Sequence, residues 1–238
     1  MNIPTELTEG LLFEGEAKEV EFLEHIIQWH ESMYIEESTD YTEMQLFLQL
    51  SLFRSKLILS SFLQSCELRN PLTTALLVRT HYETTGGLAF LKKRINSYHF
   101  GGIDEDALRI SVSKLLRGTR TKQAFSPIAE NRIHDSVNVM TLIDAVDDFT
   151  KKQALPSPIF RECYDKLSEI CHPNFIGLSI GFDLSDEGRT VRYLKDFPSL
   201  SPGHYHYYDF ALSLTIFKEL FLSLRLQLQE GLHDGSAE

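Results

Sequence analysis

An arginine and a glutamate lie one helical turn apart in the segment VRTHYETTGGLAFL, at Arg79 and Glu83. The same helical face carries small and apolar residues, so we expect both side chains to point toward neighbouring helices rather than into water. A guanidinium and a carboxylate at this spacing can pair and still bind a further group. The two residues therefore predict either a structural ion pair or a catalytic or ligand-binding site.

A second polar segment, YDKLSEICHPN, contains Tyr164, His172 and Asn174. Tyr164 and His172 lie about two helical turns apart, and Pro173 should end the helix directly after His172. A histidine at that position can titrate near neutral pH and act as a general base, and Tyr164 and Asn174 are candidate ligand-binding residues beside it. The alternative is a helix cap, because Asn174 can bind carbonyl groups left open at the helix end.

One stretch of the chain is positively biased. Residues 107–129 contain no acidic residue but include five basic ones, shortly after the KKR sequence at 92–94: Arg109, Lys114, Arg117, Arg120 and Lys122. We call these five residues the basic strip, in which Arg117 and Arg120 are candidate residues for binding an RNA or a nucleotide. The alternative is charge capping, since acidic residues at 104–106 precede the basic ones in the order that a helix dipole favours.

Several familiar chemistries lack their motifs. The sequence has no GxGxxG, GxxxxGK[ST], GxSxG or HExxH, which leaves dinucleotide, P-loop, hydrolase and zinc-protease functions without local support. The cysteines Cys66, Cys163 and Cys171 form neither an even-numbered disulfide set nor a CxxC pair. We therefore expect no cofactor and no metal site.

Composition and charge indicate a cytoplasmic globular protein. Of its 238 residues 42% are hydrophobic, enough for a sizeable core, and the amino terminus does not resemble a signal peptide. No uninterrupted apolar run approaches the roughly 18 residues of a membrane span, so we expect no membrane contact. The net charge of −11 opposes broad binding to nucleic acids and is compatible with a basic protein partner.

Hydrophobic periodicity predicts an all-α fold, a single multi-helix bundle over residues 1–238. Residues 1–12 and 231–238 are expected to be loosely ordered. A small β-hairpin is predicted near residues 177–194, where IGLSIGFDL and RTVRYL flank a turn-forming sequence. The apolar residues of 41–66 run nearly all round the helix, which predicts a central core helix. The predicted helices span about 14–33, 41–66, 71–95, 105–116, 135–152, 158–171 and 205–229.

Together, the VRTHYETTGGLAFL and YDKLSEICHPN segments resemble a group of poorly characterised bacterial helical-bundle proteins, over roughly residues 40–180. More distantly, such bundles are similar to the HEPN superfamily. Many of its members are metal-independent ribonucleases or nucleotide-binding modules of toxin and phage-defence systems. The resemblance implies a helical homodimer that acts on RNA or nucleotides in stress or phage defence.

The catalytic motif of that superfamily is an arginine and a histidine four to six residues apart. Arg94 and His99 match it formally, but the abundance of both residue types makes one such match expected by chance. The alternative places Arg79 and His172 together across the bundle, with His172 as general base and Arg79 stabilising the phosphate. The rival hypothesis is a non-enzymatic interaction or immunity-type module whose polar core residues only specify packing.

Overall fold

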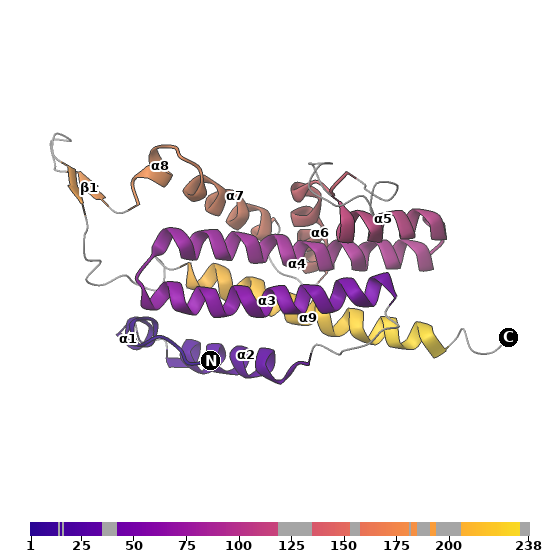
Figure 1. Ribbon diagram of the computed structural model, residues 1–238, viewed down its shortest axis with the longest axis horizontal. Helices are drawn as coiled ribbons and strands as arrows, with labels where there is room; N and C mark the ends of the chain where they lie inside the picture. Colours follow the sequence, from indigo (N-terminus) through magenta and orange to yellow (C-terminus); the bar gives the residue numbers. More distant parts are fainter. Residues whose placement is uncertain are drawn as a thin grey trace, which may run out of the picture. The chain divides into compact units, whose positions relative to one another are not determined.

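The structure is a computed structural model, and it describes residues 1–13, 15, 17–34, 42–118, 135–152, 158–180, 182–184, 191–193 and 206–233. These residues are mostly helical (Figure 1), which confirms the all-α prediction. The helices are α1 (Thr5–Phe13), α2 (Ala17–Ser32), α3 (Glu43–Glu67), α4 (Pro71–His99), α5 (Glu105–Arg117), α6 (Val139–Lys151), α7 (Ile159–Cys171), α8 (Phe175–Leu178) and α9 (Tyr207–His233).

Two short strands, β1 (Phe182–Leu184) and β2 (Val191–Tyr193), pair antiparallel, with Phe182 opposite Tyr193. The residues that join them, 185–190, lie outside the described part of the chain, so the hairpin near 177–194 stays a prediction. The segment 177–180 of the predicted hairpin is instead the end of α8 and the turn after it.

The chain divides into two compact units. Unit 1 comprises residues 1–34, 55–82 and 162–215, and unit 2 comprises 35–54, 83–161 and 216–238. The three longest helices, α3, α4 and α9, each contribute residues to both units.

Unit 1 begins with two helices where the sequence pattern predicted one. Residues 5–13 form α1, which overlaps most of the segment 1–12 that was expected to be loosely ordered, and its Leu7 and Leu11 are fully buried. The carbonyl of Pro4 accepts hydrogen bonds from the backbone N–H groups of Leu7 and Thr8. A helix this short is stabilised by packing rather than by its intrinsic propensity, which is why periodicity alone missed it.

A chain of buried hydrogen bonds joins four helices of unit 1. It runs from His30 on α2 through Ser55 on α3 and His81 on α4 to Ser213 on α9, and all four residues are fully buried. The oxygen of Ser55 lies 2.9 Å from His30 Nε2 and 2.9 Å from His81 Nε2, and His81 Nδ1 lies 2.7 Å from Ser213 Oγ. His30 Nδ1 lies 3.0 Å from the carbonyl oxygen of Ile26.

Only one arrangement of protons satisfies this chain when both imidazoles are neutral. The Ile26 carbonyl can only accept, so His30 Nδ1 carries the proton and its Nε2 accepts from Ser55. Because the Ser55 hydroxyl has one proton, His81 Nε2 must donate to it, and His81 Nδ1 then accepts from Ser213. Each hydrogen bond in this series therefore points the same way, from Ser213 through His81, Ser55 and His30 to the Ile26 carbonyl.

In unit 2, the carboxyl-terminal half of α4 packs closely against neighbouring helices because of two glycines. A Cβ atom at Gly86 would lie 2.8 Å from Leu142 Cβ and 2.9 Å from the backbone carbonyl of Leu142 on α6. A Cβ atom at Gly87 would lie 3.0 Å from the ring tip of Phe47 on α3. Gly86 therefore lets α6 approach the α4 backbone at a distance that a side chain would prevent, and Gly87 leaves room for the ring of Phe47 on α3.

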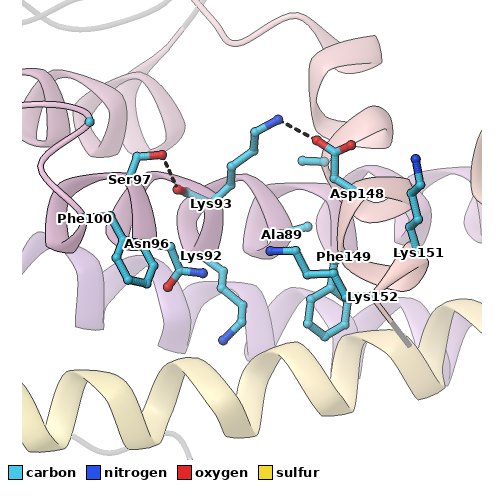
Figure 2. A pocket seen from close by; sticks show the side chains of 12 residues that line it. Ala89, Lys92, Lys93, Asn96, Ser97, Phe100, Asp148, Phe149, Lys151 and Lys152 are labelled. Atoms are coloured by element: carbon cyan, nitrogen blue, oxygen red, sulfur yellow. Dashed lines mark hydrogen bonds and ion pairs between the residues drawn. The ribbon is translucent and has the colours of Figure 1, made fainter. Parts of the chain in front are cut away.

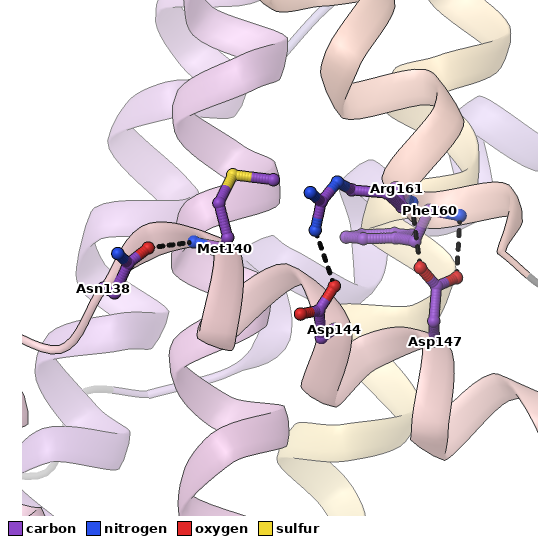
Figure 3. A network of polar contacts seen from close by, with 6 residues as sticks. All are labelled: Asn138, Met140, Asp144, Asp147, Phe160 and Arg161. Carbon is purple, nitrogen blue, oxygen red and sulfur yellow. Dashed lines mark hydrogen bonds and ion pairs between the residues drawn. The ribbon is translucent and has the colours of Figure 1, made fainter.

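A buried carboxylate of α6 fixes the start of α7. Asp147 accepts hydrogen bonds from the backbone N–H groups of Phe160 and Arg161, each at 2.9 Å (Figure 3). The Arg161 side chain also donates to Asp144 at 2.7 Å. Burial raises the pKa of Asp147, and the two backbone hydrogen bonds oppose this rise. These contacts cap helix donors that would otherwise have no partner.

The prediction that α3 is core on all sides is wrong for one face. Leu46, Leu50 and Phe53 are 37%, 50% and 46% exposed, whereas Leu48 and Leu52 are buried. Spacings of four and three residues place the exposed three on one face, so the helix is apolar both toward the core and away from it. By length and composition alone α3 could cross a membrane, yet half of its most apolar window is buried. The predicted absence of membrane contact stays a prediction.

Candidate functional site

The structure brings two of the predicted site residues into contact. Arg79 of α4 donates from Nε and Nη2 to the hydroxyl of Tyr164 on α7, at 3.3 and 3.2 Å. The guanidinium carbon lies 5.3 Å from the centre of the Tyr164 ring. Tyr164 is buried and Arg79 half-buried, as is Glu83 one turn further along α4. Arg79 is thus held by an aromatic residue of a neighbouring helix.

The second predicted segment ends α7 as expected, but its polar residues serve a different helix. His172 follows the last residue of α7, is exposed, and its imidazole makes no hydrogen bond, ion pair or ring contact with any described residue. Asn174 accepts from the N–H of Gly177 at 2.9 Å and donates to Glu169 at 2.7 Å. Asn174 therefore caps the start of α8 rather than the end of α7. The pairing of Arg79 with His172 stays a prediction.

The basic strip is only partly described. Arg117 forms an ion pair with Glu43 at 2.5 Å and donates to Ser113 at 3.3 Å. Arg109 lies 3.8 Å from Asp106, and both side chains are largely exposed. Arg120 and Lys122 lie outside the described residues. The Arg117 guanidinium is therefore already engaged by a carboxylate, which weakens the case for this residue as an anion ligand.

A cavity of about 840 Å³ lies in unit 2, between the end of α4 and the end of α6 (Figure 2). Two adjacent lysines of α4, Lys92 and Lys93, line it together with Lys151 and Lys152 at the end of α6. Its volume is in the range of sites that hold small molecules. The cavity thus gathers four lysines in a chain whose net charge is −11.

The four lysine ammonium groups differ in whether a neighbouring side chain pairs with them. Lys93 forms an ion pair with Asp148 at 2.6 Å, and Lys92 donates to Ser223 of α9 at 2.5 Å. Lys151 and Lys152 are exposed, and their ammonium groups have no hydrogen-bond or ion-pair partner within the described ranges. Asp148 is the one carboxylate among the lining residues that are described. The cavity therefore carries an excess of positive charge.

Electrostatics favour an anion in this cavity. Burial lowers the pKa of Lys92, and repulsion from the Lys152 ammonium lowers it further. Both effects mean that the charged form of Lys92 is less stable here than in water. An anion between the two ammonium groups would stabilise them and offset the repulsion. Phosphate is one anion that lysine binds as a point charge.

The cavity also offers apolar and aromatic surface. Phe100, at the turn after α4, and Phe149 of α6 both line it, and the Phe100 side chain is largely exposed. Figure 2 shows Phe100 and Asn96 on the opposite side of the view from Phe149, Lys151 and Lys152. A ligand that has both a flat aromatic ring and a phosphate would use both kinds of surface.

Sequence reasoning noted the lysines at 92–93 but did not combine them with Lys151 and Lys152. The two lysine pairs are 58 or more residues apart in the sequence, and Lys151 and Lys152 fit the ordinary pattern of basic residues at a helix end. Each pair consists of adjacent residues, KK, at the carboxyl-terminal part of a helix. The repeated KK pair was the sequence feature that could have pointed to this site. Only the packing of α6 on α4 shows that the two pairs line the same cavity.

Two other chemistries receive no support within the described residues. Burial and the nearby Asp209 carboxylate raise the pKa of the Cys163 thiol to about 11, so this cysteine stays neutral and unreactive at physiological pH. No group of three or more His, Cys, Asp or Glu residues in the described part of the chain is arranged to hold a metal ion.

Comparison with known proteins gives no relative. No protein-family model matches the chain, and neither a curated protein nor a solved structure matches it.

Proposed function

We propose that this protein binds a nucleotide in the lysine cavity of unit 2. The observation that carries the proposal is the convergence of four lysines and two phenylalanines on one cavity in an otherwise acidic chain. Lys151 and Lys152 contact the phosphate groups, while Phe100 or Phe149 packs against the base. The size of the cavity suits a single nucleotide, and the net charge of −11 opposes extended contact with a nucleic acid.

The test is binding of AMP, GMP, ATP, GTP and pyrophosphate, measured by isothermal titration calorimetry at low and moderate salt. We expect nucleotides to bind more tightly than pyrophosphate, because the base contributes stacking, and binding to weaken as salt screens the lysines. Lys152→Gln should weaken binding at least fivefold, because it removes a phosphate contact. Lys166→Gln removes the same charge from an exposed position on α7 and should leave binding unchanged.

Three outcomes count against the proposal. Absence of binding to every probe excludes the site, and pyrophosphate binding as tightly as the nucleotides excludes a role for the base. If a short RNA binds and Lys114→Gln weakens it while Lys152→Gln does not, the basic strip is the anion-binding surface instead.

The resemblance to HEPN-like bundles supplies the biological setting of the proposal: a cytosolic homodimer in bacterial stress or phage defence. The ribonuclease hypothesis requires Arg79 and His172 to act together, and the contact of Arg79 with Tyr164 gives it no added support. The rival, a protein-interaction module, predicts that no nucleotide binds and that a basic protein partner does.

A further inference from the structure

Asn96 lines the cavity, and a residue of α9 orients its amide. Gln227 Nε2 donates to Asn96 Oδ1 at 3.2 Å. The other end of Gln227, its Oε1, is buried and has no hydrogen-bond partner in the described part of the chain. If both amides were turned over, Gln227 would instead bury an NH2 group with two unsatisfied donors. One unsatisfied carbonyl oxygen costs less, so the observed orientation is the favoured one.

This orientation determines what Asn96 can offer to a ligand. Its oxygen already accepts a hydrogen bond from Gln227, and its NH2 group has no partner among the described residues and can donate to a ligand in the cavity. The ammonium groups of Lys151 and Lys152 can also only donate. Asp148, the carboxylate of the described lining, is engaged by Lys93. The part of a ligand that meets the NH2 group of Asn96 must therefore be a hydrogen-bond acceptor.

Nucleobases differ in this respect. Guanine and hypoxanthine carry a 6-keto oxygen beside N7, two adjacent acceptors, whereas adenine carries a 6-amino donor at the same place. An amino group facing the Asn96 NH2 would leave two donors without an acceptor. We propose that Asn96, held by Gln227, makes the cavity selective for 6-keto purine nucleotides over adenine nucleotides. This inference rests on the proposed nucleotide site and adds its specificity.

IMP and AMP provide the sharpest comparison, because the only difference between them is the keto or amino group at position 6, with the proton that the keto form carries on N1. Calorimetric titration of the full chain should give IMP an affinity about five- to tenfold higher than AMP, the effect of one unmade hydrogen bond. Asn96→Asp replaces the donor by an acceptor, so the ratio of the IMP and AMP affinities should fall to one or below. Asn138→Asp adds the same charge at the exposed start of α6, where either residue caps the helix, and should leave the ratio unchanged.

Gln227→Leu tests the orienting role separately. Without Gln227 the Asn96 amide can rotate, so the IMP preference should drop toward one while both nucleotides still bind. Equal affinities of IMP and AMP for the unmodified protein, with both bound, would overturn the selectivity and leave the nucleotide site standing. Failure of both nucleotides to bind would overturn the proposed function and the selectivity together. Circular dichroism of each variant checks that it is folded.

Discussion

At the scale of single residues, Ser55 is held by two buried hydrogen bonds. Its hydroxyl lies between two buried imidazoles and donates to one while it accepts from the other. The two imidazoles, His30 on α2 and His81 on α4, meet at this oxygen. The stability of unit 1 should therefore depend on Ser55 more than its small size indicates.

Ser55→Ala should lower the free energy of unfolding by about 1–3 kcal/mol, because it leaves buried nitrogen atoms without their shared partner. Ser61→Ala, on the same helix and only half-buried, should change it by less than about 0.5 kcal/mol. Urea unfolding of both variants measures the difference. Equal losses would show that the hydrogen bonds of Ser55 add nothing to stability.

The residue scale is also where sequence reasoning was least informative. The pattern placed Arg79 and Tyr164 among the interior polar residues, and the structure joins them. It gave no reason to connect Lys92 with Lys152 or Asn96 with Gln227, because each of these relations crosses between helices distant in sequence. Periodicity indicates which face of a helix is buried but not which other helix covers that face.

At the scale of elements, the long helices were predictable because their signals are local. Asn70 and Pro71 mark the start of α4, and Asp104 caps α5 through a hydrogen bond to the N–H of Ala107. The sequence did not predict that α3 has one buried apolar face and one exposed apolar face. An apolar residue gives the same sequence pattern whether or not a neighbouring helix covers it. The close approach of α6 to α4 likewise depends on Gly86, and the sequence alone does not show which helix packs against this glycine.

The two glycines of α4 form a matched pair for mutation. A Cβ atom at Gly86 meets the backbone of Leu142, which can move only with α6, whereas a Cβ atom at Gly87 meets the movable ring tip of Phe47. Gly86→Ala should therefore lower the free energy of unfolding by about 1–3 kcal/mol relative to Gly87→Ala. The gain in helix propensity is the same in both variants and cancels. Chemical denaturation gives the comparison, and a Gly87→Ala variant that is the less stable one would contradict the packing argument.

At the scale of the whole molecule, α3, α4 and α9 are continuous through both compact units. If one unit unfolded alone, the folded part of each of these helices would stop at the boundary between the units. The backbone hydrogen bonds that cross this boundary would then be lost. Unfolding of the described fold should therefore be a single cooperative transition.

Trp29 provides the measurement, because it is the single tryptophan of the chain and contacts His30 in unit 1. In guanidinium chloride, the transition of Trp29 fluorescence should coincide with the loss of helical circular dichroism, which reports both units. Two separate midpoints would show that the units unfold independently despite their shared helices.

The hydrogen-bond direction along the chain from Ser213 to Ile26 has one more consequence. It requires His30 to be the Nδ1–H tautomer and His81 the Nε2–H tautomer, two opposite forms within one protein. In an unfolded chain the two imidazoles would have no reason to differ. The nitrogen chemical shifts of the two rings should therefore differ when the four helices of unit 1 are packed together and become alike when they come apart.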